Sequence, residues 1–214
     1  MVKGYIQIFG LDYGDIFSPV AKMVFVCLFI AMAALQQWPL FQLDVKNAFL
    51  NGDLQKDIYM EQLPDFVAQG ESSGLVCRLQ KFLYGLKQSP RVWFEKFSNV
   101  VQPFGMTPSE IDYSIFYCHS SVGSFYLVVY VDHIVLTSSD HNDISQVKQH
   151  LCQNFQTKNL GKLRYFLGIE VAQSNTGIVI SQRKYAFDIL EEIGLMNSKS
   201  VDTPMDPNVK LLLN

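Results

Sequence analysis

The stretch SFYLVVYVDHIVLTSS, residues 124–139, decides the fold. Two β-rich arms, residues 125–131 and 134–137, flank Asp132 and His133, and this pattern is typical of a hairpin with a tight two-residue turn. We therefore predict an antiparallel strand pair, with Tyr130 and Asp132 on one face and the turn at Asp132 and His133.

Two more segments continue the strand pattern outward from this hairpin. In FQLDV, residues 41–45, a period of two places Phe41, Leu43 and Val45 on one face and Asp44 on the other. Residues 163–182 predict a further hairpin with Gly177 in its turn. Strands and helices mix without regular β–α–β alternation, so we predict an α+β fold with antiparallel pairing.

Helical patterns lie between the strands. Residues 23–35 are apolar all round, which is typical of a buried helix, and their 13 residues fall short of the roughly 20 that a bilayer span needs. A second helix is predicted with Ser89 as N-cap and Pro90 at its first position, and its aromatic residues at helical spacing predict core packing rather than base stacking. Two more helices are expected after Asp140 and over residues 183–193.

Composition sets the class of the chain. Its 214 residues are 49% hydrophobic and 17% charged, which excludes disorder and fits one domain, with or without a small appendage. Without a secretion signal or a membrane span, the chain is expected to be intracellular and not secreted. The four cysteines form no metal-binding or disulfide pattern and are expected to be core thiols. Separately, residues 69–74 are predicted to form a flexible loop.

The net charge is −3, but the basic and acidic residues are grouped in separate segments of the chain. Residues 78–96 and 148–184 are basic, and residues 110–143 hold five acidic and no Lys or Arg side chains. Such a chain can present a basic face beside an acidic pocket, as binding of a polyanion and its metal ions requires. The alternative is that these charges belong to solvated helix faces.

Two acids, Asp44 and Asp132, each interrupt apolar sequence at a strand end. Either alone could be an exposed turn residue, but together they suggest two-metal phosphoryl transfer, which needs carboxylates about a metal's width apart. His119, His141 and His150 have no partner at ligand spacing and are expected to be surface or turn residues.

Several blocks occur in an order that is highly specific. WPLFQLDVKNAFLNGDL (38–54), VCRLQKFLYGLKQSPRVWFEKF (76–97), YVDHIVLTSSD (130–140) and LGKLRYFLGIEV (160–171) closely resemble the reverse transcriptase domain of copia-type LTR retrotransposons. The resemblance covers residues 2–211. It implies a right-hand polymerase with a palm sheet at about 37–52 and 91–206, partial fingers at about 1–36 and 53–90, and a tail at 207–214.

The resemblance also implies an activity and its residues. A reverse transcriptase extends a primer with deoxynucleotides on an RNA or DNA template, using two Mg²⁺ or Mn²⁺ ions. Asp44 and Asp132 would be catalytic and would bind metal with the carbonyl of Val45. The nucleotide would meet Val45, Asn47, Ala48, Phe49 and Gln88, with Phe49 under the sugar, and the template and primer would meet Lys87, Ser89, Pro90 and Arg91.

The chain departs from the family pattern at three places. His133 stands where the family has a second acid after Asp132, the basic fingers residues that precede AKGYTQ in the family are missing, and no ribonuclease H or integrase segment can be identified. These departures predict an N-terminally truncated, degenerate and inactive copy. The alternative is a non-enzymatic palm remnant with weak nucleic-acid binding or no selected function.

Overall fold

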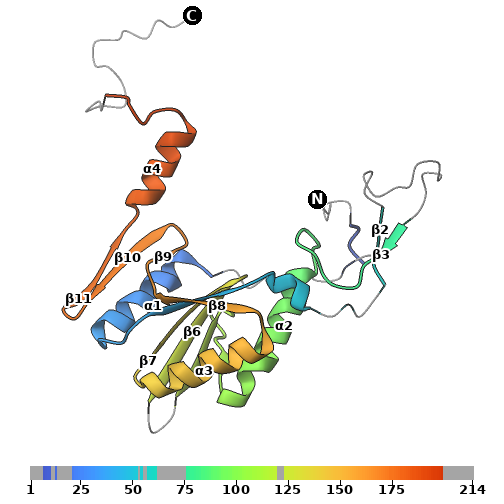
Figure 1. Ribbon diagram of the computed structural model, residues 1–214, viewed down its shortest axis with the longest axis horizontal. Helices are drawn as coiled ribbons and strands as arrows, with labels where there is room; N and C mark the ends of the chain where they lie inside the picture. The colour runs from blue at the N-terminus through green and yellow to red at the C-terminus, as the bar shows by residue number, and fades with distance from the viewer. Residues whose placement is uncertain are drawn as a thin grey trace, which may run out of the picture. The chain divides into compact units, whose positions relative to one another are not determined.

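The computed structural model describes residues 7–10, 13, 21–52, 54, 57–61, 76–119 and 123–199 (Figure 1). The predicted loop at 69–74 and the predicted tail at 207–214 lie outside them. In chain order the helices and strands are α1 (Met23–Leu35), β1 (Phe41–Val45), η2 (Ala48–Asn51), β2 (Tyr59–Glu61), β3 (Val76–Arg78), α2 (Ser89–Val101), η4 (Gln102–Phe104), β4 (Thr107–Pro108), β5 (Ile115–His119), β6 (Ser124–Tyr130), β7 (His133–Ser138), α3 (His141–Asn154), β8 (Thr157–Lys162), β9 (Tyr165–Phe166), β10 (Ile169–Ser174), β11 (Gly177–Ser181) and α4 (Arg183–Glu192).

Six strands form the main sheet, in the order β4-β5-β6-β7-β1-β8 (Figure 1). Every neighbouring pair in it is antiparallel, which confirms the predicted α+β class. The strand β1 lies between β7 and β8, and Asp44 is the register partner of His133. The sheet therefore brings Asp44 next to the Asp132–His133 segment, although about 90 residues of chain separate them.

The turn of the central hairpin lies one residue earlier than predicted. Tyr130 pairs with His133, so the two turn residues are Val131 and Asp132. The backbone of Val131 is left-handed, with φ of +53°. A two-residue hairpin turn needs positive φ, yet a β-branched residue rarely adopts it, and this is why the sequence pattern assigned Val131 to the strand.

The burial of β1 follows the prediction except at Gln42. Leu43 and Val45 are buried, and Asp44 remains half-buried, as the period of two predicts. Gln42 is also buried, although it points to the same face of the sheet as Asp44.

Helices α2 and α3 pack against one face of the main sheet. The core cluster joins apolar residues of the strands, of α2 and of α3: Leu43, Val45, Leu127, Val129, Ile134 and Leu136; Trp93, Phe97 and Val101; Ile144, Val147 and Leu151. The predicted core role of the α2 aromatic residues is thus confirmed.

The predicted N-cap of α2 is displaced by one residue. Gln88 is the N-cap, and the Ser89 hydroxyl instead donates to the Leu83 carbonyl at 2.8 Å.

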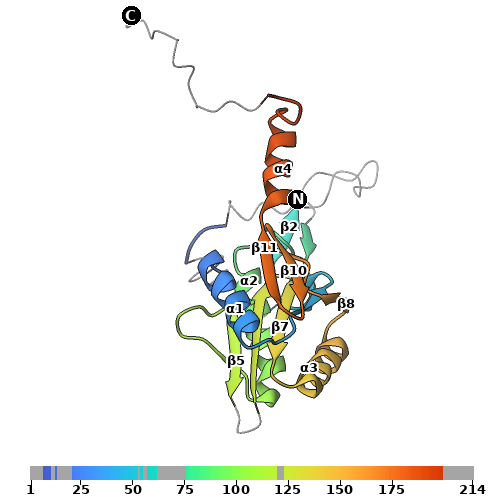
Figure 2. The same ribbon diagram turned by 90° about the vertical axis from the view of Figure 1, so that its left-hand side faces the viewer.

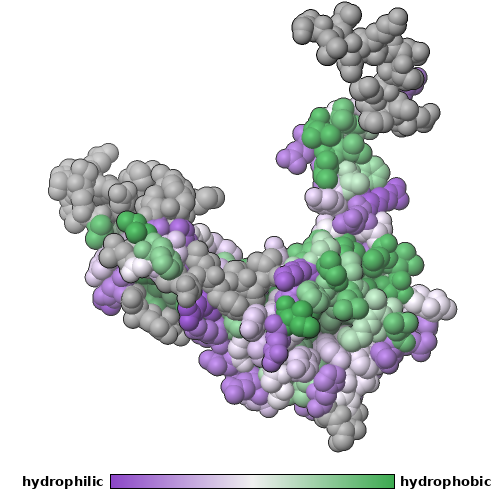
Figure 3. Space-filling model, turned by 180° about the vertical axis from the view of Figure 1, so that it is seen from behind, coloured by the Kyte–Doolittle hydropathy of each residue, from purple (hydrophilic) through white to green (hydrophobic). Residues whose placement is uncertain are grey.

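Helix α1 is only partly buried, which corrects the prediction of a buried helix. Val26, Phe29, Ile30 and Ala33 are buried, but the opposite face is open, and Leu35 is 84% exposed. Figure 3 shows an apolar surface where α1 lies. No helix in the described ranges is long and apolar enough to cross a membrane.

The contacts divide the chain into two units: residues 1–163 with 173–178, and residues 164–172 with 179 onward. In the second unit, α4 follows β11 and has no buried residue (Figure 2). Strands β9, β10 and β11 form a three-stranded sheet, as the predicted second hairpin requires. The predicted boundaries of fingers and palm stay a prediction.

The cysteine and histidine predictions need correction. All four cysteines are free, but none is a core thiol, because Cys77 and Cys152 are exposed and Cys27 and Cys118 are half-buried. His119 and His141 are exposed, as predicted, but His150 is half-buried in α3, and its Nε2 is 2.9 Å from the Val100 carbonyl of α2.

The sheet core gives the first testable prediction. Leu136 is fully buried, so Leu136→Ala should lower the free energy of unfolding by about 2–5 kcal/mol, measured by urea denaturation. The matched control is Leu35→Ala on the open face of α1, which should change that free energy by less than about 0.5 kcal/mol. Equal losses in the two variants would contradict this assignment of the core.

Candidate metal centre

Three side chains gather where β1 meets the turn between β6 and β7. Asp44, Asp132 and His133 each offer a ligand atom, and these atoms lie within 4.8 Å of one another. The side chains of Asp44 and Asp132 are about one-third exposed, at 34% and 36%, so a solute can reach them. The structure therefore brings together the two acids that the sequence singled out.

Two hydrogen bonds to backbone carbonyls fix this arrangement. The Val45 amide donates to the Asp132 carbonyl at 2.7 Å, and the Trp93 indole Nε1–H donates to the Val131 carbonyl at 2.8 Å. Both carbonyls of the turn therefore have a donor from outside the hairpin. Because Val45 follows Asp44 directly, the first of these bonds ties the backbones that carry the two acids.

The imidazole of His133 lies between the two carboxylates. Its Nδ1 is 3.5 Å from Asp44 Oδ1, and its Nε2 is 3.7 Å from Asp132 Oδ1. Nδ1 is buried and has no hydrogen-bond partner among the described residues. Buried polar atoms are nearly always satisfied, so an unpaired nitrogen beside two carboxylates fits a cation ligand.

The donor set fits a divalent cation. Carboxylate oxygens are ligands for Mg²⁺ and Mn²⁺, whereas an imidazole suits Mn²⁺ or Zn²⁺ better than Mg²⁺. Val45 can contribute through its backbone alone, because its side chain is buried in the core.

Tyr84 belongs to the same site, although it was not predicted from the sequence. Burial raises the pKa of its hydroxyl, the negative charges of Asp132 and Asp44 raise it further, and a backbone hydrogen bond to Ala48 opposes them. The ring centroid of Tyr84 is 4.6 Å from that of Phe49. The available signal in the sequence was an aromatic residue next to Gly85 in LYGLKQSP. A single aromatic residue does not indicate that its ring lies near Asp44 and Asp132 in the fold.

The residues predicted to meet the nucleotide lie beside the acids in sequence. Asn47 has left-handed backbone and precedes η2, and the side chains of Ala48 and Phe49 are buried in the core cluster. Ala48 can therefore act only through its backbone. With Phe49 only 8% exposed, Tyr84 at 43% presents the larger aromatic surface here.

Gln88 and Lys87, which were predicted to meet the nucleotide and the template, make hydrogen bonds to residues outside the three-residue centre. Gln88 and Lys87 bond to Gln7: Gln88 Oε1 accepts from Gln7 Nε2 at 3.0 Å, and the Lys87 amide donates to Gln7 Oε1 at 2.9 Å. The Lys87 ammonium donates to the Tyr13 hydroxyl at 2.9 Å. Among the described residues, these hydrogen bonds of Gln88 and Lys87 thus go to Gln7 and Tyr13.

The predicted template residues of α2 are partly engaged in the fold. Ser89 is buried and bonded to Leu83, Pro90 is half-buried in the first turn, and Arg91 pairs with Glu95 at 3.0 Å. Their roles toward template and primer stay predictions.

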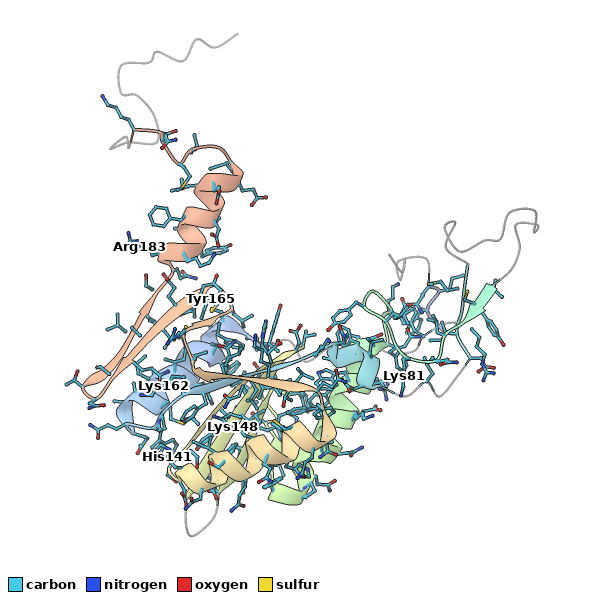
Figure 4. The ribbon with its side chains drawn as sticks, viewed as in Figure 1. Lys81, His141, Lys148, Lys162, Tyr165 and Arg183 are labelled. Carbon is cyan, nitrogen blue, oxygen red and sulfur yellow. The ribbon has the colours of Figure 1, made fainter. Side chains whose placement is uncertain are left out.

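Several cations of the basic segments are also engaged. Lys148 of α3 stands 3.7 Å from the centre of the Phe41 ring, and burial lowers the pKa of its ammonium (Figure 4). Lys184 pairs with Asp188 at 2.7 Å in α4. Lys184 lies on the exposed helix α4 and so fits the alternative of solvated helix faces, whereas Lys148 is partly buried against an aromatic ring and does not.

Comparison with known proteins identifies the class. Residues 1–207 match the family described as reverse transcriptase (RNA-dependent DNA polymerase). The chain is 41% identical over 213 residues to the retrovirus-related Pol polyprotein from transposon RE1 of Arabidopsis thaliana, covering 100% of the chain and 14% of that protein. It is 37% identical to that from transposon TNT 1-94 of Nicotiana tabacum, covering 99% of the chain and 16% of that protein.

The chain therefore belongs to the reverse transcriptase family. It corresponds to the reverse transcriptase domain of copia-type retrotransposon Pol polyproteins, as the sequence predicted, and it spans about one-seventh of the RE1 polyprotein. The antiparallel sheet covered by α2 and α3 is its palm-like fold. A structure of telomerase from Candida albicans aligns with a TM-score of 0.43 at 12% identity, covering 85% of this chain and 39% of that one.

The electrostatics of the centre give the second prediction. Asp132→Asn removes a negative charge that favours the neutral phenol of Tyr84, so the pKa of Tyr84 should fall while remaining raised by burial. Titration of the tyrosine ring carbons by NMR measures it. Tyr126 is the control, since burial alone raises its pKa and the substitution should leave it unchanged. If the pKa of Tyr84 does not change, Tyr84 does not interact electrostatically with Asp132.

Proposed function

We propose that the chain adds deoxynucleotides to the 3′-hydroxyl of a primer on an RNA or DNA template, at the centre formed by Asp44, Asp132 and His133. The observation that supports this is the convergence of the two carboxylates from β1 and the hairpin turn, with all ligand atoms within 4.8 Å. The family match supports the same reaction.

In this proposal the carboxylates of Asp44 and Asp132, with the carbonyl of Val45, hold divalent cations. When bound, such cations neutralise the triphosphate and make the primer hydroxyl a better nucleophile. The protein keeps the two negative charges in fixed positions through the sheet and the Val45–Asp132 hydrogen bond. The amides of Asn47 and Ala48 face the triphosphate, and Phe49 limits the space beside the sugar.

In this proposal, His133 determines which divalent cation the centre binds best. A neutral imidazole in place of a third acid leaves two negative charges to balance two divalent cations, and Mg²⁺ loses its water reluctantly for so little compensation. We propose that this copy is degenerate, that it is inactive or nearly inactive with Mg²⁺, as the departures in its sequence predict, and that Mn²⁺ restores measurable extension.

The second candidate is a non-enzymatic palm remnant that binds nucleic acid weakly. The position of the His133 ring favours it, because the imidazole lies within 3.7 Å of both carboxylates, where a catalytic cation would bind.

Repair of the centre is the third prediction. His133→Asp should lower the Kd for Mg²⁺ at least about tenfold in calorimetry, because a charged oxygen ligand replaces a neutral nitrogen. Primer extension in Mg²⁺ should then exceed that of the unmodified chain. Asp44→Asn in the same background is the control and should abolish both gains.

Two outcomes would contradict the proposal. Extension by the unmodified chain that is as efficient in Mg²⁺ as in Mn²⁺ would show that His133 does not limit the site. Mn²⁺ binding that persists in Asp44→Asn at full affinity would place the cation elsewhere.

Sugar selection gives the fourth prediction. Phe49→Ala should admit ribonucleotides in a Mn²⁺ primer-extension assay, since discrimination by overlap depends on side-chain volume. Phe49→Tyr keeps the ring and should keep the discrimination. If Phe49→Ala still rejects ribonucleotides, Phe49 has no part in the choice of sugar.

A further inference from the structure

The turn that carries Asp132 is conformationally unfavourable. Val131 is β-branched and adopts φ of +53°, a region that such residues rarely occupy. Strained backbone of this kind persists only where surrounding contacts over-determine it.

Two donors from outside the hairpin hold this turn. The Val45 amide fixes the Asp132 carbonyl, and the Trp93 indole fixes the Val131 carbonyl. The peptide groups on both sides of the Asp132 Cα are thus oriented. The direction of the Asp132 side chain follows from those two peptide planes.

Trp93 is held rigidly enough to act in this way. The residue is 3% exposed, and its ring lies 5.7 Å from Phe97 and 5.0 Å from Phe155 by centroid distance. A ring packed on two sides cannot follow the turn if the turn relaxes. The indole N–H is therefore a fixed donor that the backbone of the turn must meet.

We propose that Trp93 is a positioning residue, whose indole N–H holds Val131 in the left-handed conformation that keeps the Asp132 carboxylate next to Asp44. The inference rests on the proposed metal centre for its consequence in metal binding. The restraint on the turn itself can be measured without any metal.

The experiment separates the N–H from the ring. Trp93→Phe keeps an aromatic ring in the core and removes the donor, whereas Phe97→Leu disturbs the same core and leaves the donor in place. Phe97 is the matched control because it is fully buried on the same helix and packs against Trp93.

Native-state hydrogen exchange by NMR is the first measurement. In Trp93→Phe, the protection of the Val45 amide should fall about tenfold or more relative to amides in the middle of the β6–β7 ladder, the scale of one lost hydrogen bond. In Phe97→Leu the protection should fall evenly. The Trp93 indole N–H of the unmodified chain should itself exchange slowly.

Mn²⁺ binding, followed by electron paramagnetic resonance, is the second measurement. The Kd for Mn²⁺ should rise about tenfold in Trp93→Phe and stay within about twofold in Phe97→Leu. If the unmodified chain binds no Mn²⁺, the proposed centre fails while the exchange data still decide the role of Trp93.

The inference is overturned if Trp93→Phe leaves the Val45 amide as protected as before, or if Phe97→Leu reproduces the same local loss. Should Trp93→Phe not fold, replacement of Trp93 by benzothienylalanine keeps the ring shape and puts sulfur in place of the N–H. Trp38→Phe then leaves Trp93 as the single tryptophan for that replacement. The same local loss of protection is expected, and its absence overturns the inference.

Discussion

The 2.7 Å hydrogen bond from the Val45 amide to the Asp132 carbonyl is the constraint on which the centre depends. It joins the end of β1 to the tip of the β6–β7 hairpin, so the two acids are neighbours through backbone and not through flexible side chains. The packing of α2 and α3 on the same strands makes that backbone rigid. Sites on rigid elements hold geometry better than sites on free loops.

Alternation of apolar residues was enough to predict the hairpin and β1, and the lack of regular β–α–β alternation was enough to predict antiparallel pairing in general. It could not place the turn, because Val131 has the side chain of a strand residue and the backbone of a turn residue. Its left-handed conformation is imposed by Trp93 and Val45, which are distant in sequence. The same applies to Ser89, whose hydroxyl bonds to Leu83 instead of capping α2.

Residues of the candidate site could be predicted where the residue type alone indicates the chemistry. They could not be predicted where their role depends on which side chains lie nearby in the fold. Asp44 and Asp132 stand out as acids in apolar sequence, and the structure joins them. Tyr84 does not stand out, because its place near the acids depends on the path of the loop before α2. Likewise, the composition of α1 shows an apolar helix but not that one face lacks a partner among the described residues.

The half-exposed setting of His133 has a consequence for how such sequences change over generations. Its side chain is 43% exposed and belongs to no part of the core cluster, so exchange of an acid for an imidazole there removes no packing. Selection that acts on folding would not oppose the exchange, since surface substitutions cost little stability. In this domain, loss of chemistry and loss of structure can therefore proceed at separate rates, and a copy can remain well folded long after its active centre has drifted.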